Sequence, residues 1–378
     1  MRVLHCPEIV GGNAQQLARS ERELGLESRA VVFRQNYLNY ETDRALLPAN
    51  GPRWKVELVR WKLFWSALSC DVVHYNSGQT IMPAAVHFRD SRLKKLPLPI
   101  RLLLHAYTHA LELLDMRLLK MLGKGIVITF QGDDARQGEY CRKHFRVTFA
   151  GEVEEGYYSP ASDEMKRRRI GKIAALADRI HAVNPDLLHV LPPSARFLPY
   201  GHIDLREWPV DTTAKSGDRP VILHAPSHKG VKGTRFILAA LDRLKAEGIP
   251  FDFVLVEGMS REEARKQYER ADLLVDQLLA GWYGGLAVEL MALGKPVICY
   301  IRDEDLQYIP EEMAEEIPVI RADPDTICEV LRHHLTEARE NLREIGMKGR
   351  RYAEKWHDPS KIAAHLKQEY EEIMEGRS

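Results

Sequence analysis

The chain has 378 residues, of which 45% are hydrophobic and 29% charged, and its 54 Lys and Arg balance its 54 Asp and Glu. This length predicts about two to three domains with sizeable cores, and the composition excludes a disordered chain. The formal net charge of zero excludes a nucleic-acid-binding protein built on a global basic field, and equally an acidic solvating protein.

Short apolar runs alternate with amphipathic stretches in the first half of the chain. The runs are rich in β-branched residues, as buried parallel strands are. Residues 191–200 contain three prolines and little periodicity, which predicts a linker. The strands expected before it are residues 3–6, 28–33, 71–75, 126–130 and 179–183, and the expected helices are residues 14–24 and 163–177.

The same alternation starts again after the linker. The expected strands are residues 221–225, 252–257, 273–276 and 297–300, and the expected helices are residues 234–247, 261–270, 286–293, 324–350 and 359–374. Strand–helix alternation on both sides of a linker predicts two doubly wound α/β domains in tandem. Because ligands bind outside the carboxyl ends of the strands in such sheets, we expect the site in the cleft between the domains.

The cysteines and the N-terminus indicate where the protein works. The five cysteines are scattered, odd in number and without Cys-x-x-Cys spacing, which argues against a disulfide framework or a zinc site. No apolar run is long enough to span a bilayer, and the N-terminus enters a strand-like run without a signal-peptide core. We therefore expect a cytoplasmic protein.

Two glycine-containing loops follow expected strands and precede expected helices. Gly11 and Gly12 follow the first strand, where their backbone N–H groups can approach an anion, although the pair taken alone favours an ordinary turn. The pair lacks the Gly-x-Gly-x-x-Gly spacing of nicotinamide-binding Rossmann enzymes. In residues 224–234, Lys232 lies beside a helix N-terminus and suits a diphosphate; a solvated loop is the alternative.

Residues 271–298 are the most informative stretch. An expected strand ends in a Gly-rich aromatic turn, and a helix begins at once with Glu289 about one turn inside it. A carboxylate among apolar residues is costly unless it is hydrogen-bonded, and vicinal ribose hydroxyls are natural partners. Donors from the protein itself are the alternative.

This stretch resembles the retaining nucleotide-sugar glycosyltransferases of the GT-B fold, family 4 in particular. Glu289 and residues 291–297 match the second half of the family's Glu-x7-Glu motif, and residues 283–284 match its aromatic–glycine turn. The first glutamate of the motif, which would contact the donor sugar, corresponds to Gly281, and the following glycine to Trp282. The resemblance implies that Glu289 holds the ribose and that amides near Gly284 hold the diphosphate.

Weaker family marks occur in the same order along the chain. Lys232 stands at the phosphate-binding lysine, with Ser227 where arginine is usual, and residues 131–134 resemble the family's His-Gly-x-Asp turn with Gln131 in place of His. The family's Asp-Val-Val-His strand end is similar to residues 71–74, and the segment that opens its second domain is similar to residues 200–204. The segment before its last helix is similar to residues 357–359. These substitutions indicate a divergent branch.

The resemblance implies an α/β GT-B architecture. Its expected parts are an acceptor-side domain of residues 1–195, a nucleotide-sugar domain of residues 196–355, and a helix in residues 356–378 that crosses back to the first domain. The implied catalytic residues are Lys232, Glu289 and Asp134. The implied donor-binding residues are Gly11, Gly12, Ser227, Lys232, Trp282, Tyr283, Gly284, Gly285 and Glu289, and the acceptor-side candidates are His74, Gln131, Asp133 and Asp134, with a structural turn as the alternative for residues 131–134.

The implied reaction moves a hexose from a UDP- or GDP-sugar to an acceptor hydroxyl with retention. Positive charge or N–H dipoles stabilise the leaving diphosphate, and no protein nucleophile is required. We predict no cofactor and no metal requirement, because the lysine and the N–H dipoles can stabilise the diphosphate without a metal and no Asp-x-Asp pair is convincing as a metal site. The pair in residues 323–325 lies near a predicted helix start and reads as a helix cap. The expected acceptor is a glycan, a lipid-linked glycan of the cell envelope or exopolysaccharide, or a small molecule. A catalytically silent sugar-nucleotide-binding or assembly protein and a sugar-nucleotide epimerase remain alternatives.

The zero net charge is the sum of two opposite halves. Residues 1–200 carry a net charge of +8 and residues 201–378 a net charge of −8, and residues 44–146 alone carry 17 basic and 8 acidic side chains. Tryptophans stand among these cations in residues 53–65, a combination that suits an anionic membrane surface and a peripheral location. Tryptophans in the core with solvated cations are the alternative. Nothing resembles an RNA-binding module, so we expect no nucleic-acid partner.

Overall fold

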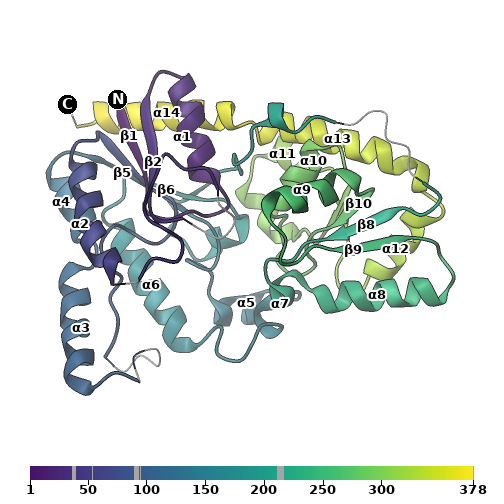
Figure 1. The fold of residues 1–378 in the computed structure, drawn as a ribbon, viewed down its shortest axis with the longest axis horizontal. Helices are drawn as coiled ribbons and strands as arrows, with labels where there is room; N and C mark the ends of the chain where they lie inside the picture. Colours follow the sequence, from purple (N-terminus) through teal and green to yellow (C-terminus); the bar gives the residue numbers. More distant parts are fainter. Residues whose placement is uncertain (36–39, 53, 89–92, 94, 211–216, 378) are drawn as a thin grey trace.

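The computed structural model describes residues 1–35, 40–52, 54–88, 93, 95–210 and 217–377. Two parallel β-sheets, each covered by helices on both faces, lie next to each other along the long axis of the molecule (Figure 1). The first sheet has seven strands in the order β3-β2-β1-β4-β5-β6-β7, and the second has five in the order β12-β11-β10-β8-β9. The predicted fold class, two doubly wound parallel sheets, is confirmed.

The first sheet is built from the first half of the chain. Its strands are β1 (Arg2–Cys6), β2 (Glu27–Arg34), β3 (Arg44–Leu47), β4 (Val72–Tyr75), β5 (Gly125–Phe130), β6 (Arg179–Ala182) and β7 (Arg196–Phe197). The helices in this half are α1 (Asn13–Glu23), α2 (Lys55–Leu68), α3 (Leu98–Leu111), α4 (Leu114–Met121), α5 (Gly138–His144), η2 (Phe149–Gly151), α6 (Pro160–Ala174) and η3 (Pro185–His189). The edge strand β7 lies within the stretch predicted as a linker.

Alternation along the buried strands divides the core of this domain into two layers. Val3, Val72 and Val127 pack with α1 and the C-terminal helix, whereas Leu4 and Val73 face the opposite side, where α2, α4 and α6 lie. This is the period of two that a strand imposes on its side chains. Each face of the sheet is therefore covered by its own set of helices.

The second sheet is built from the second half of the chain. Its strands are β8 (Val221–His224), β9 (Asp252–Leu255), β10 (Leu273–Val275), β11 (Val297–Cys299) and β12 (Ile320–Arg321). The helices are η4 (Leu205–Glu207), α7 (Lys229–Lys232), α8 (Thr234–Ala246), α9 (Arg261–Arg270), α10 (Gly285–Ala292), η5 (Asp303–Tyr308), α11 (Glu311–Glu315), α12 (Ile327–Leu335), η6 (Arg339–Asn341), α13 (Leu342–Trp356) and α14 (Pro359–Glu375).

The single helix predicted for residues 324–350 is wrong, because the structure has two helices separated by η6. α12 packs with α8 on one face of the second sheet, whereas α13 packs with α10 in the cluster on the other face. One straight helix cannot cover both faces. Gly346 of α13 lies so close to the Gly294 carbonyl that a Cβ atom there would clash with it, which fixes where α13 must run.

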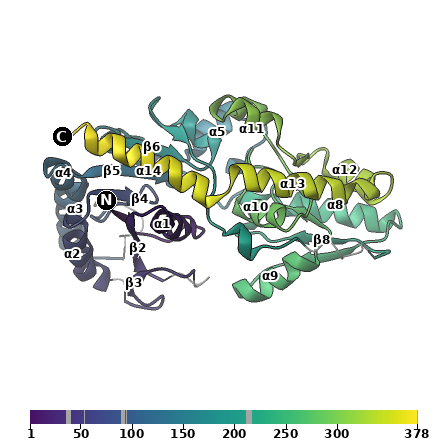
Figure 2. The ribbon, with the colours of Figure 1, turned by 90° about the horizontal axis from the view of Figure 1, so that it is seen from above.

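The last helix returns to the first domain. α14 begins with the Asp358 side chain capping the backbone N–H of Ser360, and it then runs along α1 and across β5 (Figures 1 and 2). Its apolar side, including Ile362 and Leu366, packs on Val3 of the first sheet. No helix in the described part of the chain is both long and apolar enough to cross a bilayer.

Candidate active site

Two predicted donor-side residues, Lys232 and Gly284, meet where β8 and β10 end. Lys232, the last residue of α7, places its Nζ 2.7 Å from Oδ1 of Asp276, and the backbone N–H of Gly284 donates to Oδ2 of the same carboxylate at 2.8 Å. Asp276 directly follows β10 and its side chain is completely buried. The structure thus brings Lys232 and Gly284 together through an aspartate whose role the sequence did not indicate.

The close approach of the turn to the lysine depends on glycine. A Cβ atom at position 284 would lie 3.1 Å from Lys232 Nζ, closer than most side-chain contacts. Gly284 is also the residue that precedes the first turn of α10, where backbone N–H groups lack helical partners. An ammonium group and free amide dipoles at one place form a site suited to an anion such as a diphosphate.

Glu289 lies one helical turn further along α10, beside a histidine. Its Oε1 is 3.5 Å from Nε2 of His202, and both side chains are nearly buried. Neither ring nitrogen of His202 has a hydrogen-bond partner among the described residues. Burial, and to a smaller degree the charge of Glu289, raise the pKa of the Tyr268 hydroxyl on α9. Unpaired buried polar atoms are costly, so a ligand with hydroxyl groups would be stabilised here.

The aromatic turn itself belongs to the core. The side chains of Trp282 and Tyr283 are almost fully buried and stack on each other, with ring centroids 4.3 Å apart. The Tyr283 hydroxyl lies 2.9 Å from Nε2 of His357, which follows α13. Both residues were predicted to bind the donor, and the structure places their side chains where they support the turn beneath Gly284. Packing gives a physical reason for the aromatic pair, and contact of these residues with the donor stays a prediction.

Gly281 is required by its neighbour Arg302. The glycine has a left-handed φ of 84°, and a Cβ atom there would lie 2.5 Å from Arg302 Nη1. The Arg302 guanidinium donates to Asp305 Oδ2 at 2.8 Å and to the carbonyl of Val147 in the first domain at 3.1 Å. It also lies 3.6 Å from the centre of the Phe145 ring. A glutamate at position 281 would have to displace this arginine, which gives a physical reason for the glycine.

Ser227 lies in the loop between β8 and α7, and its side chain is exposed. The next residue, His228, caps α7 by accepting the N–H of Val231 at 3.3 Å and lies 3.2 Å from Glu154 of the first domain. Arg235 at the start of α8 forms a paired salt bridge with Glu152. The loop that carries Lys232 is therefore fixed against residues 149–154.

Gly11 and Gly12 both adopt left-handed backbone angles, with φ of 59° and 75°. No other described residue lies within 4 Å of a Cβ atom built at Gly11, whereas a Cβ atom at Gly12 would clash with the Tyr40 ring. That ring also lies 5.0 Å from the guanidinium of Arg261 on α9. Gly11 thus remains open to a ligand, and Tyr40 connects the glycine loop with the helix that carries Tyr268.

The predicted acceptor-side turn is held by its own backbone. The Asp134 carboxylate accepts the N–H groups of Gln131, Gly132 and Gly78 at 2.7 to 3.1 Å. Asp133 accepts the hydroxyls of two neighbouring tyrosines; burial raises its pKa, but Arg136 and these hydroxyls outweigh burial and hold the pKa below its usual range. No hydrogen bond of the Gln131 side chain is found among the described residues. Asp134 therefore acts as a turn stabiliser in this structure.

His74 lies in the interface between the first sheet and α14. Its Nδ1 is 2.7 Å from the hydroxyl of Tyr370, and its Nε2 is 2.7 Å from Oγ1 of Thr129. Burial holds the pKa of His74 well below its usual value, with smaller contributions from His5 and His181. The ring is neutral and both nitrogens are occupied, so the structure places His74 in the packing of α14.

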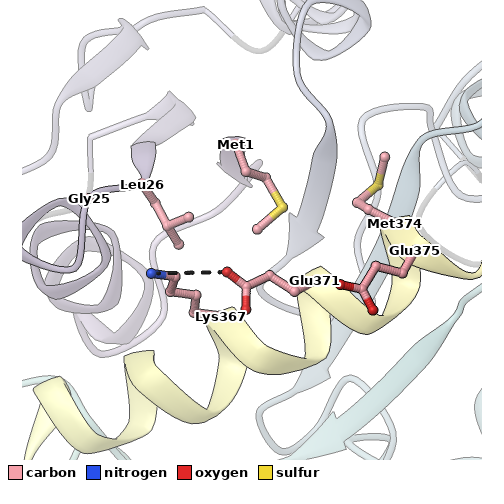
Figure 3. Close-up of a pocket in the computed structure, with 7 residues that line it drawn as sticks. All are labelled: Met1, Gly25, Leu26, Lys367, Glu371, Met374 and Glu375. Atoms are coloured by element: carbon pink, nitrogen blue, oxygen red, sulfur yellow. Dashed lines mark ion pairs between the residues drawn. The ribbon is translucent and has the colours of Figure 1, made fainter. Parts of the chain in front are cut away.

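Two surface pockets lie elsewhere. One is formed by α14 and the residues before β1 and β2, where Lys367 and Glu371 are 4.0 Å apart (Figure 3). It opens at the amino ends of these strands, opposite to the ends where ligands bind in such sheets. The other is lined by residues 315–318 and the exposed side of α13. Neither pocket includes a predicted site residue.

Comparison with known proteins shows the fold. No family model matches the chain, and no curated protein matches its sequence. HepE from Anabaena, solved in complex with UDP-glucose, is 10% identical with a TM-score of 0.59 over 97% of this chain and 98% of that chain. Sucrose-phosphate synthase from Thermosynechococcus elongatus is 13% identical with a TM-score of 0.59 over 100% of both chains.

The fold is GT-B. The UDP-GlcNAc 2-epimerase from Neisseria meningitidis, bound to UDP-GlcNAc, shares this fold, with 10% identity and a TM-score of 0.50 over 98% of this chain and 99% of that chain. At such identities the likeness covers the architecture of the two domains, and the residues of the site must carry any statement about chemistry.

Proposed function

We propose that the chain is a glycosyltransferase that moves a hexose from a UDP- or GDP-sugar to an acceptor hydroxyl with retention of the anomeric configuration. The observation that carries the proposal is the cluster of Lys232, Asp276 and Gly284 at the carboxyl ends of β8 and β10. Two observations support a nucleotide-sugar donor: the sequence resembles family 4 motifs, and the structurally similar HepE was solved in complex with UDP-glucose.

We call the carboxyl ends of β8 and β10, with Lys232, Asp276, Gly284 and Glu289, the donor edge. In this proposal, the donor edge stabilises the leaving diphosphate. The Lys232 ammonium and the amides at the start of α10 face the place where negative charge develops as the glycosidic bond breaks, which lowers the barrier without a protein nucleophile. The buried carboxylate of Asp276 holds the Lys232 ammonium group and the Gly284 N–H in position. Glu289 and the unpaired nitrogens of His202 would bind the ribose hydroxyls.

The test is a panel of UDP- and GDP-sugars assayed for hydrolysis and for transfer. Lys232→Ala and Glu289→Ala should each lower transfer about tenfold or more, which corresponds to about 1.4 kcal/mol of transition-state stabilisation. The anomer of the product, read by NMR, tests retention, and activity in EDTA tests the predicted independence of metal. Unchanged turnover in both variants would contradict the assignment.

A matched variant separates catalysis from stability. Lys232→Ala also leaves the buried Asp276 carboxylate without its cation, and this alone destabilises a fold. Lys232→Met combined with Asp276→Asn removes both charges. If transfer stays low in a folded double variant, the cation itself is needed for the reaction.

The proposed acceptor is a lipid-linked glycan of the cell envelope or an exopolysaccharide precursor, with a free glycan or small molecule as the other possibilities. The basic surplus of the first domain, +9 over residues 44–146, suits an acceptor that carries phosphate. We propose a location in the cytoplasm, peripherally at the inner face of the membrane.

A sugar-nucleotide epimerase is the second candidate, favoured by the shared fold of the Neisseria meningitidis enzyme. The third candidate is a catalytically silent protein that only binds a sugar nucleotide. Gly281 favours it, because a glycine provides no carboxylate for the donor sugar. The donor panel distinguishes them. Epimerised donor would indicate the epimerase, and calorimetric binding without turnover would indicate the silent protein.

A further inference from the structure

The helix α2 carries apolar side chains on two opposite sides. Leu63, Phe64 and Ala67 point into the core of the first domain. On the other side, a stripe of large apolar residues is exposed, with Trp54 at 64% and Trp65 at 68% of their full surface. The stripe consists of Trp54, Leu58, Trp61 and Trp65, a spacing that places all four on one side of a helix.

The next helix, α3, continues this exposed apolar surface. Leu98, Ile100, Leu102 and Leu103 are exposed, and Thr108 is the one described residue of α3 that is buried. α3 is attached to α2 by a hydrogen bond from the Tyr107 hydroxyl to Glu57 at 2.7 Å. Figures 1 and 2 both show α2, α3 and α4 along the side of the first domain that faces away from the second domain. We call the exposed residues of α2 and α3 the α2–α3 face.

Among the described residues, the charges around this face that lack an acidic or hydrogen-bonding partner are positive. They are the exposed Lys55, Lys62, Lys95 and Arg117, whereas the exposed Lys120 donates to the carbonyl of Leu176 at 2.9 Å. Each described acidic residue between positions 54 and 124 already has a partner in the protein. These partners are Arg60 and Tyr107 for Glu57, Arg2 for Asp71, Arg169 and Lys172 for Glu112, and Tyr75 for Asp115.

We propose that the α2–α3 face docks onto an anionic lipid bilayer. Exposed tryptophans between lysines are the combination that an interface of headgroups and acyl chains binds, because the rings enter the interface while the ammonium groups remain at the anionic headgroups. Apolar side chains this exposed would otherwise remain in water at a cost in free energy. Resting on the proposed function, this docking holds the first domain at the membrane that carries a lipid-linked acceptor.

The composition of the face argues against a second copy of the chain as its occupant. A symmetric contact would bring Lys55 and Lys62 of each copy toward the same cations of the other without an acidic partner among the described residues of the face. An anionic bilayer supplies the missing negative charge. The orientation keeps the second domain, which carries the donor edge, away from the lipid.

The experiment is co-sedimentation of the full chain with vesicles of phosphatidylcholine, with and without phosphatidylglycerol, at low and high salt. We expect binding to the anionic vesicles that weakens with salt, and a loss of about tenfold or more in partitioning for Trp54→Ala/Trp61→Ala/Trp65→Ala and for Lys55→Ala/Lys62→Ala. Arg243→Ala/Lys245→Ala, which removes two charges from exposed positions of α8 at the other end of the molecule, is the matched control and should bind like the unchanged chain.

Donor hydrolysis without lipid is measured on the same variants, so that failure of docking and failure of the proposed function are distinguishable. We expect it to stay unchanged in the tryptophan and lysine variants, which also shows that they fold. Equal binding to neutral vesicles would overturn the anionic part of the proposal. Absence of vesicle binding, or a dimer in sedimentation velocity that the tryptophan variant abolishes, would overturn the lipid as the occupant.

Discussion

The protein satisfies four polar residues to different degrees, Asp134 and His74 in the first domain and His202 and Glu289 in the second. In the first domain, Asp134 accepts three backbone N–H groups and both nitrogens of His74 have partners. In the second domain, neither nitrogen of His202 has a hydrogen-bond partner among the described residues, and the one ion-pair partner of Glu289 found among them is this histidine at 3.5 Å. Since an unpaired buried polar atom costs free energy, a protein retains it where something else supplies the partner.

This contrast separates structural polar groups from candidate ligand groups better than residue type does. Among the described residues, His202 on the donor side has polar atoms without a partner, whereas the carboxylate of Asp134 in the acceptor-side turn is fully used. We therefore expect substitutions of satisfied groups to change stability and substitution of Glu289 to change transfer. Lys232 is paired with Asp276, so its substitution should change both. Four substitutions test this distinction between structural and ligand groups, and the one with the largest expected effect comes first.

Arg302 connects the two domains, and its removal should cost the most free energy of unfolding. Arg302→Ala leaves the fully buried Asp305 carboxylate with His189 as its remaining partner and removes the bond to Val147 of the first domain. Removing one partner of a buried ion pair costs about 3–5 kcal/mol of the free energy of unfolding, measured by urea denaturation. Adding Asp305→Asn should recover part of this loss. Equal stability of the single and double variants would show that the ion pair is not the cause.

His224 is a satisfied polar group at the donor edge itself. Its Nδ1 lies 2.8 Å from the carbonyl of Val275 and its Nε2 2.9 Å from Oγ1 of Thr234, and burial lowers its pKa to about 4 from 6.5. The unfolded chain therefore takes up the proton at higher pH than the folded chain, so the stabilisation is complete above about pH 6.5 and is lost as the pH falls. Between about pH 7 and pH 4 the loss is about 3 kcal/mol.

The measurement for His224 is the free energy of unfolding at both pH values, in the unchanged chain and in His224→Gln. Other groups titrate in the same range, and they are common to both proteins. The variant should lose about 3 kcal/mol less than the unchanged chain over this range. A parallel decrease in the two proteins would mean that His224 is not buried as a neutral group.

Gly281 tests whether the departure from the family motif is forced by packing. Gly281→Ala places a side chain on a left-handed backbone and within 2.5 Å of the Arg302 guanidinium. The backbone conformation alone costs about 1–3 kcal/mol, to be read from urea denaturation. Gly281→Glu should be destabilised in the same way without a gain in transfer. Higher transfer in Gly281→Glu would show instead that the position is open to the donor.

The alternation of strands and helices was predictable because it depends on local periodicity. The meeting of Lys232 and Gly284 was also predictable, since both follow strands of one parallel sheet and the carboxyl ends of such strands share an edge. Asp276 and His202 were missed because their roles depend on contacts that no local pattern encodes. His202 and Glu289 are far apart in the chain and meet only after the second domain has folded.

Tryptophan shows the same limit. Trp282 is almost completely buried, whereas Trp65 is 68% exposed, and both stand among apolar residues in the sequence. The orientation of each depends on which side of its element faces the sheet. The break between α12 and α13 is similar, because it follows from two helices covering opposite faces of the second sheet. These features depend on tertiary contacts, which the periodicity of a local sequence does not encode.

Asp134 is the test with the smallest expected effect, and it decides whether the comparison holds. Asp134→Asn keeps one acceptor oxygen for the three backbone N–H groups, so we expect a loss of about 1 kcal/mol in the free energy of unfolding. Because the carboxylate is already used by the turn, transfer should fall no more than about threefold, against about tenfold or more for Lys232→Ala. Asp134→Asn with unchanged stability and a loss of about a hundredfold in turnover would identify a general acid or base. In that case a fully satisfied carboxylate would take part in the chemistry. The lack of a protein partner would then no longer separate candidate ligand groups from structural groups.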